Sequence, residues 1–269
     1  MHAVSTKQLF LRPDLYMETK PEVLGVVLAR GRSKSILKKS IALCAGKPLM
    51  YYTIEAAKRA TSITRLIIST DDEEMAEYAK SQGVEVPFMR PKELAEDLSP
   101  DLPVFEYVLA ELKKRENYVP DAVVHLRPTT PLKKASDIDK GVELFFTHPE
   151  AQSVRSICEP LHTPFKMYTM REDGFLEPLL PKVFPEVFEK YPEAYNMPRQ
   201  LLPKVWRHSG YVDVIRPSVI TDLHSMSGTN IFPLQFEKWR DVDIDSSYEL
   251  AMAGNIIENL RREGKESWD

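Results

Sequence analysis

Short apolar runs alternate with amphipathic stretches along the first half of the chain. The run from Leu24 to Ala29 is apolar without a break, which is typical of a parallel strand covered by helices on both faces. The stretch 49–60 instead places its apolar residues at helical spacing, directly after Pro48, a residue suited to the start of a helix. The same reasoning predicts strands at 65–69, 84–89 and 122–126, a helix that begins within 69–74 and ends at about 81, and helices at 102–114 and 136–146.

Strand and helix alternate in this way over about 120 positions, which is the pattern of βαβ units in an open parallel sheet. We therefore predict an α/β fold. Sheets of this kind bind ligands at the carboxyl ends of their strands. The loops that follow Ala29, Ile68 and Leu126 are thus the places where we expect a binding site. A strand at 210–215 and a last helix at 247–262 complete the predicted elements.

Between residues 160 and 205 the pattern changes, because prolines become frequent and the helical and strand periodicities are lost. Glu172-Asp173-Gly174 predicts a hairpin turn between two short extended segments. The unit is rich in aromatic residues and too irregular to be stable alone, so we interpret it as an exposed insertion that makes a subunit contact. We predict one domain at 22–269 that contains this insertion, preceded by an N-terminal extension at 1–21.

The composition narrows the class of protein. Of the 269 residues 43% are hydrophobic, which is enough for a buried core and excludes a disordered or fibrous chain. The longest apolar run, 23–29, is far shorter than the roughly 20 residues that cross a bilayer, and the N-terminal extension has no apolar core of a signal peptide. Cys44 and Cys158 have no partner at a metal-binding or redox spacing, which favours a reducing cytoplasm.

The overall charge is nearly balanced, because 36 Lys and Arg residues face 40 Asp and Glu residues, for a net charge of −4. A protein that neutralises many phosphates usually carries a basic excess, so we expect no nucleic acid partner. An anionic ligand must instead meet a local cluster of cations. Such a cluster follows the first strand and consists of Arg30, Arg32, Lys34, Lys38 and Lys39.

This basic loop, residues 29–41, is the most informative segment of the sequence. Gly31 and the serines of the loop allow backbone amides to approach an oxyanion, and together with the cations they suit a triphosphate. The alternative is a basic loop that is merely solvated. It is not a Walker A motif, because Ile41 occupies the place of the first glycine and Pro48 that of the Ser or Thr.

Asp241, Asp243 and Asp245 alternate just before the last predicted helix. In an extended segment their carboxylates point to one face, which is costly unless a divalent cation lies among them. Magnesium is the natural choice, since it takes one or two carboxylates and fills its shell with water and phosphate. The alternative is that Asp245 or Ser246 caps the helix, where Ser246 and Glu249 offer a capping box, and both interpretations can hold together.

Two further predicted strand ends carry polar side chains. Arg90 has a guanidinium suited to a phosphate or a carbonyl group, although a lone arginine is more often part of a surface ion pair. In the segment 127–132 two prolines stiffen a turn, and Thr129 and Thr130 are predicted to face the crevice. The six histidines show no zinc-binding spacing.

Taken in order, seven segments resemble motifs of the acylneuraminate cytidylyltransferases, the family of the CMP-N-acetylneuraminate synthetases. They are the loop 29–41, Gly46-Lys47-Pro48-Leu49, Ser69-Thr70-Asp71, Arg90-Pro91 with Glu93-Leu94-Ala95-x-Asp97, the segment 128–132, Pro198-Arg199-Gln200-x-Leu202-Pro203, and Asp243-Ile244-Asp245. The resemblance implies a Rossmann-like nucleotidyltransferase fold, with helices on both faces of a mostly parallel sheet and a small dimerisation subdomain.

The resemblance also implies a reaction. The anomeric hydroxyl of a nine-carbon, sialic-acid-like ulosonic acid attacks the α-phosphate of CTP, releases pyrophosphate and forms a CMP-sugar for surface glycans. Mg²⁺ is the implied cofactor, CTP and an acidic sugar are the implied substrates, and a homodimer is the implied assembly. Two alternatives stay open: a related transferase that uses another nucleotide, such as GTP with a sugar 1-phosphate, and a homologue that binds nucleotide without catalysis.

The resemblance implies catalytic, nucleotide-binding, sugar-binding and metal-binding roles for particular residues of this chain. Catalysis falls to Arg30, Lys39 and Asp245, and nucleotide binding to Arg30, Gly31, Ser33, Lys34, Lys39, Ser40 and Arg90. Sugar binding falls to Arg127, Thr129, Thr130, Arg199, Gln200 and Ser209, of which Arg199 and Gln200 serve the site of the neighbouring subunit. The implied metal ligands are Asp243 and Asp245.

Several positions depart from the family pattern. The usual Gly-Gly-Ser-Lys-Gly is here Gly-Arg-Ser-Lys-Ser at 31–35, and Ser40 replaces an asparagine. Arg127 replaces the glutamine of the turn, and Ser-Gly-Tyr-Val-Asp at 209–213 replaces Asn-Gly-Ala-Ile-Tyr. Because an arginine can hold an anion through two hydrogen bonds, we expect Arg127 to bind the carboxylate of an ulosonic acid or the phosphate of a sugar 1-phosphate.

Overall fold

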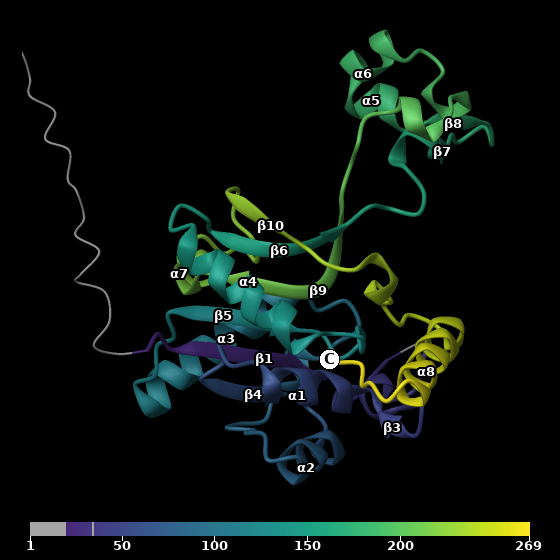
Figure 1. Cartoon of the computed structure of the whole chain (residues 1–269). Coiled ribbons are helices and arrows are strands. Elements are labelled where there is room, and N and C mark those ends of the chain that lie inside the picture. Colours follow the sequence, from purple (N-terminus) through teal and green to yellow (C-terminus); the bar gives the residue numbers. More distant parts are fainter. Residues whose placement is uncertain (1–19, 34) are drawn as a thin grey trace, which may run out of the picture.

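A computed structural model describes residues 20–33 and 35–269, and for residues 182 and 187 the backbone alone. Its centre is a six-stranded sheet in the order β10-β6-β9-β5-β1-β4. The strands are β1 (Val23–Leu28), β4 (Arg65–Ser69), β5 (Ala122–Leu126), β6 (Ser153–Cys158), β9 (Arg207–Ile215) and β10 (Ile231–Gln235). β4, β1 and β5 pair in parallel, as do β6 and β10, whereas β9 runs antiparallel between β5 and β6 (Figure 1). The predicted α/β fold with a mostly parallel sheet is confirmed.

Helices and short strands surround this sheet. The α-helices are α1 (Leu49–Arg59), α2 (Glu73–Ser81), α3 (Asp101–Glu116), α4 (Ala135–Thr147), α5 (Leu180–Val183), α6 (Pro185–Lys190), α7 (Pro217–Thr221) and α8 (Ser247–Arg262). Short 3₁₀ helices are η2 (Lys39–Ile41), η3 (Lys92–Leu94), η4 (Pro164–Lys166), η5 (Ala194–Asn196), η6 (Arg199–Leu201) and η7 (Lys238–Arg240). Two small antiparallel pairs join β2 (Leu43–Cys44) with β3 (Lys47–Pro48) and β7 (Tyr168–Met170) with β8 (Leu176–Pro178).

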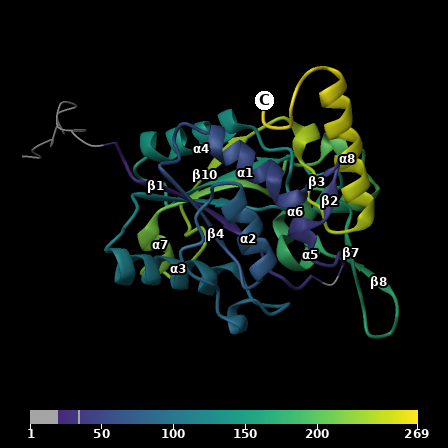
Figure 2. The ribbon, with the colours of Figure 1, turned by 90° about the horizontal axis from the view of Figure 1, so that it is seen from below.

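Helices cover both faces of the sheet, as Figure 2 shows. On β1, Val23 and Val27 belong to the core shared with α1, α4 and α8. Leu24 and Val26 point the other way, into the core shared with α3 and α7. Because both faces of β1 are buried, its sequence is apolar without alternation. The long apolar run was therefore a reliable signal for a central strand.

Other elements differ from the prediction. The strand expected at 84–89 is wrong, because only an isolated bridge between Ile67 and Glu85 forms there. Pro87 has no amide hydrogen and cannot donate to a strand ladder. β6, β10 and α7 lie outside the predicted elements, and β9 begins at Arg207 rather than at residue 210. No helix among the described residues is both long enough and apolar enough to span a membrane.

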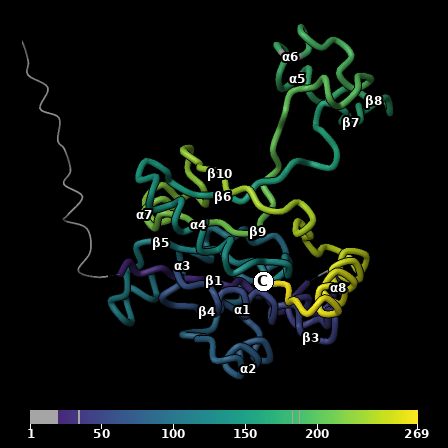
Figure 3. The backbone as a smooth tube through the Cα atoms, viewed as in Figure 1, coloured from purple at the N-terminus to yellow at the C-terminus, as the bar shows by residue number. Residues whose placement is uncertain are grey.

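Residues 160–205 lie in a small lobe that projects from the neighbouring ends of β6 and β9 (Figure 1, Figure 3). The predicted hairpin is present as β7 and β8, and Gly174 takes a positive φ of 83° at its turn. The lobe has its own small core, whose buried members are Phe165, Leu180, Ala194 and Leu202. Some aromatic residues of the lobe are therefore buried and others are exposed: Phe165 is 6% exposed, whereas Phe175 is 68% exposed. The N-terminal extension lies almost wholly outside the described residues.

Candidate functional site

A crevice of about 420 Å³ opens at the carboxyl ends of β1 and β5, two of the strand ends at which the sequence predicts a site. Its floor and walls come from the loops after these two strands, from the segment 90–99, from the start of α3 and from the segment before α8. Several predicted site residues line it: Arg30, Ser33, Lys39, Ser40, Arg90, Arg127, Thr129 and Asp245. The structure therefore brings together residues from four distant parts of the sequence.

The basic loop enters this crevice through a tight contact at Gly31. The Gly31 amide donates to Asp71 Oδ1 over 2.9 Å. A Cβ atom at this position would lie 2.9 Å from Asp72, so the loop can pass α2 only with a glycine here. Arg30 spans the crevice and donates from Nη1 to the carbonyl oxygens of Glu96 and Asp97, each over 2.9 Å.

The cations of the loop do not all face the crevice. Lys38 pairs with Asp72 at 2.9 Å and with Glu74 at 2.6 Å, so its charge is engaged at the start of α2. Lys39 turns inward and donates to the carbonyl oxygen of Ile244 over 2.7 Å. Arg32 is exposed, and Lys34 lies outside the described residues. The phosphate cluster suggested by the sequence is thus smaller than the count of loop cations implies.

The three alternating aspartates do not share one face, which corrects the prediction. The segment from Asp241 to Asp245 is not a strand, and its path is fixed by the Ile244 amide, which donates to the Thr129 carbonyl oxygen over 2.8 Å. Asp241 turns away and binds Arg207. Among the described residues, no group of three or more His, Cys, Asp or Glu side chains is arranged to hold a metal ion.

Of the three aspartates, Asp243 and Asp245 remain as candidate metal ligands, and Asp245 lines the crevice. Burial raises the pKa of Asp243, an effect that its hydrogen bond with Thr129 opposes. The side chain of Asp245 is 84% exposed and forms an ion pair of 3.2 Å with Lys39. Ser246, not Asp245, caps α8, in the predicted capping box. Asp245 is consequently available to a ligand of the crevice.

Arg90 is the buried cation of the site. It is 6% exposed, and it donates from Nε to Ser69 Oγ over 3.1 Å and from Nη2 to the Ser69 carbonyl oxygen. Burial lowers the pKa of Arg90 to about 10. The interpretation of Arg90 as a surface ion pair is therefore wrong, and the residue is rigidly placed in the crevice wall.

The turn after β5 presents one threonine to the crevice instead of the predicted two. Thr129 lines the crevice, whereas Thr130 is buried and donates from Oγ1 to the Arg127 carbonyl oxygen over 3.2 Å. The fully buried Lys133 donates to the carbonyl oxygens of Arg127 and Thr130, each over 2.7 Å. Sequence reasoning missed Lys133, because a lysine in a turn looks like a surface residue.

Arg127 is held by acidic groups on two sides. Its Nη1 lies 2.9 Å from Asp213 Oδ2, and its Nη2 lies 3.3 Å from Asp101 Oδ2. Asp213 is fully buried on β9 and also lies 2.8 Å from His208 Nε2. Burial would raise the pKa of Asp213, but the hydrogen bond with His208 and the charge of Arg127 hold it well below its usual range. The sequence did contain one signal for Asp213, a carboxylate within the otherwise apolar stretch 211–215.

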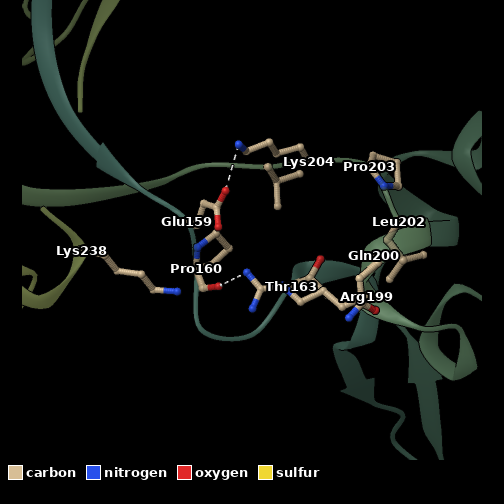
Figure 4. A pocket seen from close by; sticks show the side chains of 10 residues that line it. Glu159, Pro160, Thr163, Arg199, Gln200, Leu202, Pro203, Lys204 and Lys238 are labelled. Carbon is tan, nitrogen blue, oxygen red and sulfur yellow. Dashed lines mark hydrogen bonds and ion pairs between the residues drawn. The ribbon is translucent and has the colours of Figure 1, made fainter. Parts of the chain in front are cut away.

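Arg199, Gln200 and Ser209 lie outside this crevice. Arg199 and Gln200 line a second cavity of about 450 Å³ at the base of the lobe (Figure 4). There Arg199 donates to the carbonyl oxygens of Pro160 over 2.9 Å and Leu161 over 3.3 Å. Ser209 is buried within β9 and donates to Ser156 Oγ over 3.0 Å. In the single chain, these predicted sugar ligands do not join the crevice.

Comparisons with known proteins agree with this architecture. The family described as Cytidylyltransferase matches residues 24–173. The CMP-N,N'-diacetyllegionaminic acid synthase of Legionella pneumophila is 34% identical over 237 residues, which cover 88% of this chain and 96% of that protein. The pseudaminic acid cytidylyltransferase of Campylobacter jejuni is 34% identical over 122 residues, which cover 45% of this chain and 52% of that protein.

Solved structures resemble the fold at low sequence identity. One is a CMP:2-keto-3-deoxy-manno-octonic acid synthetase complexed with CTP, with a TM-score of 0.63 and 13% identity. The match covers 88% of this chain and 99% of that one. At such an identity the likeness shows the fold alone.

Proposed function

The chain belongs to the cytidylyltransferase family and is a nucleotidyltransferase, and from this premise we propose that it transfers CMP from CTP to a nine-carbon ulosonic acid, with release of pyrophosphate. The observation that carries the proposal is the composition of the crevice. Arg30, Lys39 and Asp245 line it together with Arg127 and Thr129, which come from the turn after β5. The names of the similar proteins support CTP and an acidic sugar as the substrates.

The reaction needs positioning and charge neutralisation more than acid–base chemistry. The acceptor hydroxyl oxygen attacks the α-phosphorus, the bond to the β-phosphate breaks, pyrophosphate leaves, and the hydroxyl proton passes to solvent. Arg30 and Lys39 would neutralise the charge that develops on the leaving pyrophosphate. Arg90, fixed on Ser69, would orient the nucleotide without moving during the reaction.

Magnesium is the cofactor we propose, with Asp243 and Asp245 as its protein ligands. Both side chains offer oxygen donors only, which suits Mg²⁺, and two carboxylates leave room for water and phosphate oxygens. When bound, the ion neutralises phosphate charge. Lys39 forms an ion pair with Asp245 over 3.2 Å and so holds this carboxylate at the crevice.

We also propose a homodimer in which the lobe of each subunit reaches the crevice of the other. The lobe projects away from the central sheet (Figure 1). It carries Arg199 and Gln200. It also exposes apolar side chains, among them Phe175 and Leu176. Such a surface is typical of a protein–protein contact. Cys44 and Cys158 are buried free thiols, which fits the cytoplasmic location that we propose.

Pyrophosphate release tests the function directly. The protein is incubated with magnesium, each of the four nucleoside triphosphates, and a panel of ulosonic acids and sugar 1-phosphates. We expect release with CTP only when an ulosonic acid is present. Release with GTP and a sugar 1-phosphate would replace the proposal by the related transferase, and silence with retained nucleotide binding would indicate a non-catalytic homologue.

A further inference from the structure

Two of the departures from the family pattern contact each other. Arg127 and Asp213 are 86 positions apart, yet Arg127 Nη1 donates to Asp213 Oδ2 over 2.9 Å. We propose that Asp213 is a positioning residue that fixes the guanidinium of Arg127 for binding the carboxylate of the acidic acceptor. This inference rests on the proposed function and deepens it, because it names the group of the acceptor that is recognised and the buried residue that prepares the site.

The two carboxylates around Arg127 differ in burial, and this difference assigns their roles. Asp213 has no exposed surface, and β9 places it opposite His125 of β5 in the interior of the sheet. Asp101 is 42% exposed at the start of α3 and lines the crevice. A buried carboxylate cannot leave a guanidinium without a large desolvation penalty, whereas an exposed one can. Asp213 is therefore the permanent partner of Arg127, and Asp101 is an exchangeable one.

The backbone of β9 also adapts to Arg127. Gly210 has a positive φ of 69°, and a Cβ atom there would lie 3.2 Å from the Arg127 side chain. The Gly210 carbonyl oxygen accepts from Arg127 Nη1 at 3.4 Å. Nη1 is thus occupied by protein groups on β9, while Nη2 is directed to Asp101 and the crevice. The guanidinium is oriented before any acceptor binds.

The position of Asp101 shows which kind of group can bind Nη2 of Arg127, the nitrogen that faces the crevice. A planar carboxylate already lies within 3.3 Å of Nη2. Arg155 Nη2 is also 4.0 Å from Asp213 Oδ2, so that two guanidinium groups face one buried carboxylate. This charge balance favours the exchange of Asp101 for another carboxylate. When Asp101 moves aside, the carboxylate of the acceptor restores the balance. A neutral acceptor cannot do so.

Asp213→Asn, Arg127→Gln and the double variant test the proposal in the full-length protein. The acceptors are N-acetylneuraminic, legionaminic and pseudaminic acids and their methyl esters, with CTP. For the acid that supports turnover, we expect each single variant to raise KM for the acid about tenfold or more and to leave KM for CTP within about twofold. The preference for acid over ester should fall in both. The double variant should be no worse than Arg127→Gln, because the two residues act as one unit.

Two further variants separate positioning from a merely structural effect. Asp101→Asn removes the exchangeable carboxylate, so we expect KM for the acid to fall, a change that lost stability would not produce. Arg207→Gln lies on the same strand but pairs with Asp241, and it should retain the preference for acid over ester. Thermal unfolding of every variant identifies any that fails to fold, and Asp213→Glu then serves as the second substitution at that position.

The outcomes are distinguishable. If the wild type is active while Asp213→Asn keeps its KM for the acid and its preference over the ester, the inference is wrong and the proposed function stands. Equal increases in KM for CTP and the acid, or a raised KM for the acid in Asp101→Asn, would also overturn it. A wild type that is silent with every ulosonic acid would overturn the proposed function, and the inference with it.

Discussion

Asp245 is an exposed carboxylate at the edge of the crevice, where it forms an ion pair with Lys39. A side chain of this kind contributes little to stability. If Asp245 is a magnesium ligand, its loss affects chemistry alone. The contrast with Asp243, which is mostly buried and bonded to Thr129, makes Asp245 the cleaner residue for a test.

We therefore predict that Asp245→Asn lowers kcat/KM by at least about 100-fold, because an amide is a poor ligand for Mg²⁺ and leaves phosphate charge less neutralised. The melting temperature should stay within about two degrees of the wild type, as for other exposed sites. Pyrophosphate release and thermal unfolding measure the two effects. Chelation of divalent cations should abolish wild-type turnover, and unchanged activity in either experiment would contradict the metal assignment.

The cysteines allow a prediction from their pKa values. Burial raises the pKa of the Cys44 thiol to about 11, and burial with a hydrogen bond to Asp241 does the same for Cys158. At pH 8 only about one thiol in a thousand is then ionised, so both should resist iodoacetamide in the folded protein and react after unfolding in urea. Mass spectrometry of the modified chain counts the labels. Rapid labelling of the folded protein would contradict the buried position.

At the scale of elements, the sequence predicted best the strands buried on both faces and the helix ends that carry a capping motif. β1 is buried on both faces and reads as one apolar run, and the capping box of α8 fixes the start of that helix. The predicted strand at 84–89 was wrong because Pro87 cannot join a ladder. β6 escaped prediction since serines and an arginine interrupt its apolar residues, and those serines are satisfied by bonds, such as Ser209 to Ser156, that only the fold reveals.

The residues of the candidate site also fall into two groups, those whose role the local sequence predicts and those whose role depends on the fold. Residues next to strand ends, such as Arg30 and Arg127, were predictable because the carboxyl ends of parallel strands converge. Asp101, Asp213 and Lys133 were not, since each acquires its role from a partner on another element. The direction of Lys38 toward α2 was equally hidden, because its two carboxylate partners lie in a different segment.

The start of α8 offers a stability test. Ser246→Ala removes the cap and should lower the free energy of unfolding by about 1 kcal/mol at pH 7. The hydrogen bond with Ser246 lowers the pKa of Glu249, so this contribution is present at neutral pH and is lost as the pH falls through the folded-state pKa, which lies below the usual value. The cost of the substitution should therefore shrink below about pH 4.

Urea unfolding at pH 7 and at a pH below about 4 measures the free energy of unfolding that Ser246→Ala costs. Ser247→Ala changes an exposed serine in the first turn of the same helix and is the matched control. We expect that change to stay within about 0.5 kcal/mol of the wild type. Equal destabilisation by the two substitutions would show that the cap contributes nothing specific.

At the scale of the whole molecule, the proposed exchange of lobes predicts rescue between two inactive variants. Arg199→Ala would damage the lobe, and Asp245→Asn would damage the crevice. If the lobe serves the neighbouring subunit, half of the mixed dimers are heterodimers and each holds one site with both residues intact, so a refolded equal mixture should regain about a quarter of wild-type activity.

The solution mass of the wild type at micromolar concentration should correspond to two chains. Each variant alone should remain a dimer, which excludes loss of assembly as the cause of inactivity. A monomeric mass would contradict the dimer. A dimer without rescue in the mixture would mean that each chain completes its own site.

The two ends of the lobe lie side by side. Cys158 at the end of β6 and Arg207 at the start of β9 are directly opposite partners in one antiparallel ladder. In topological terms the whole lobe is an enlarged hairpin loop, and closing a longer loop costs the chain little additional entropy. Replacing residues 159–206 by a short turn should leave the strand order unchanged. The central sheet and the lobe can therefore be engineered separately.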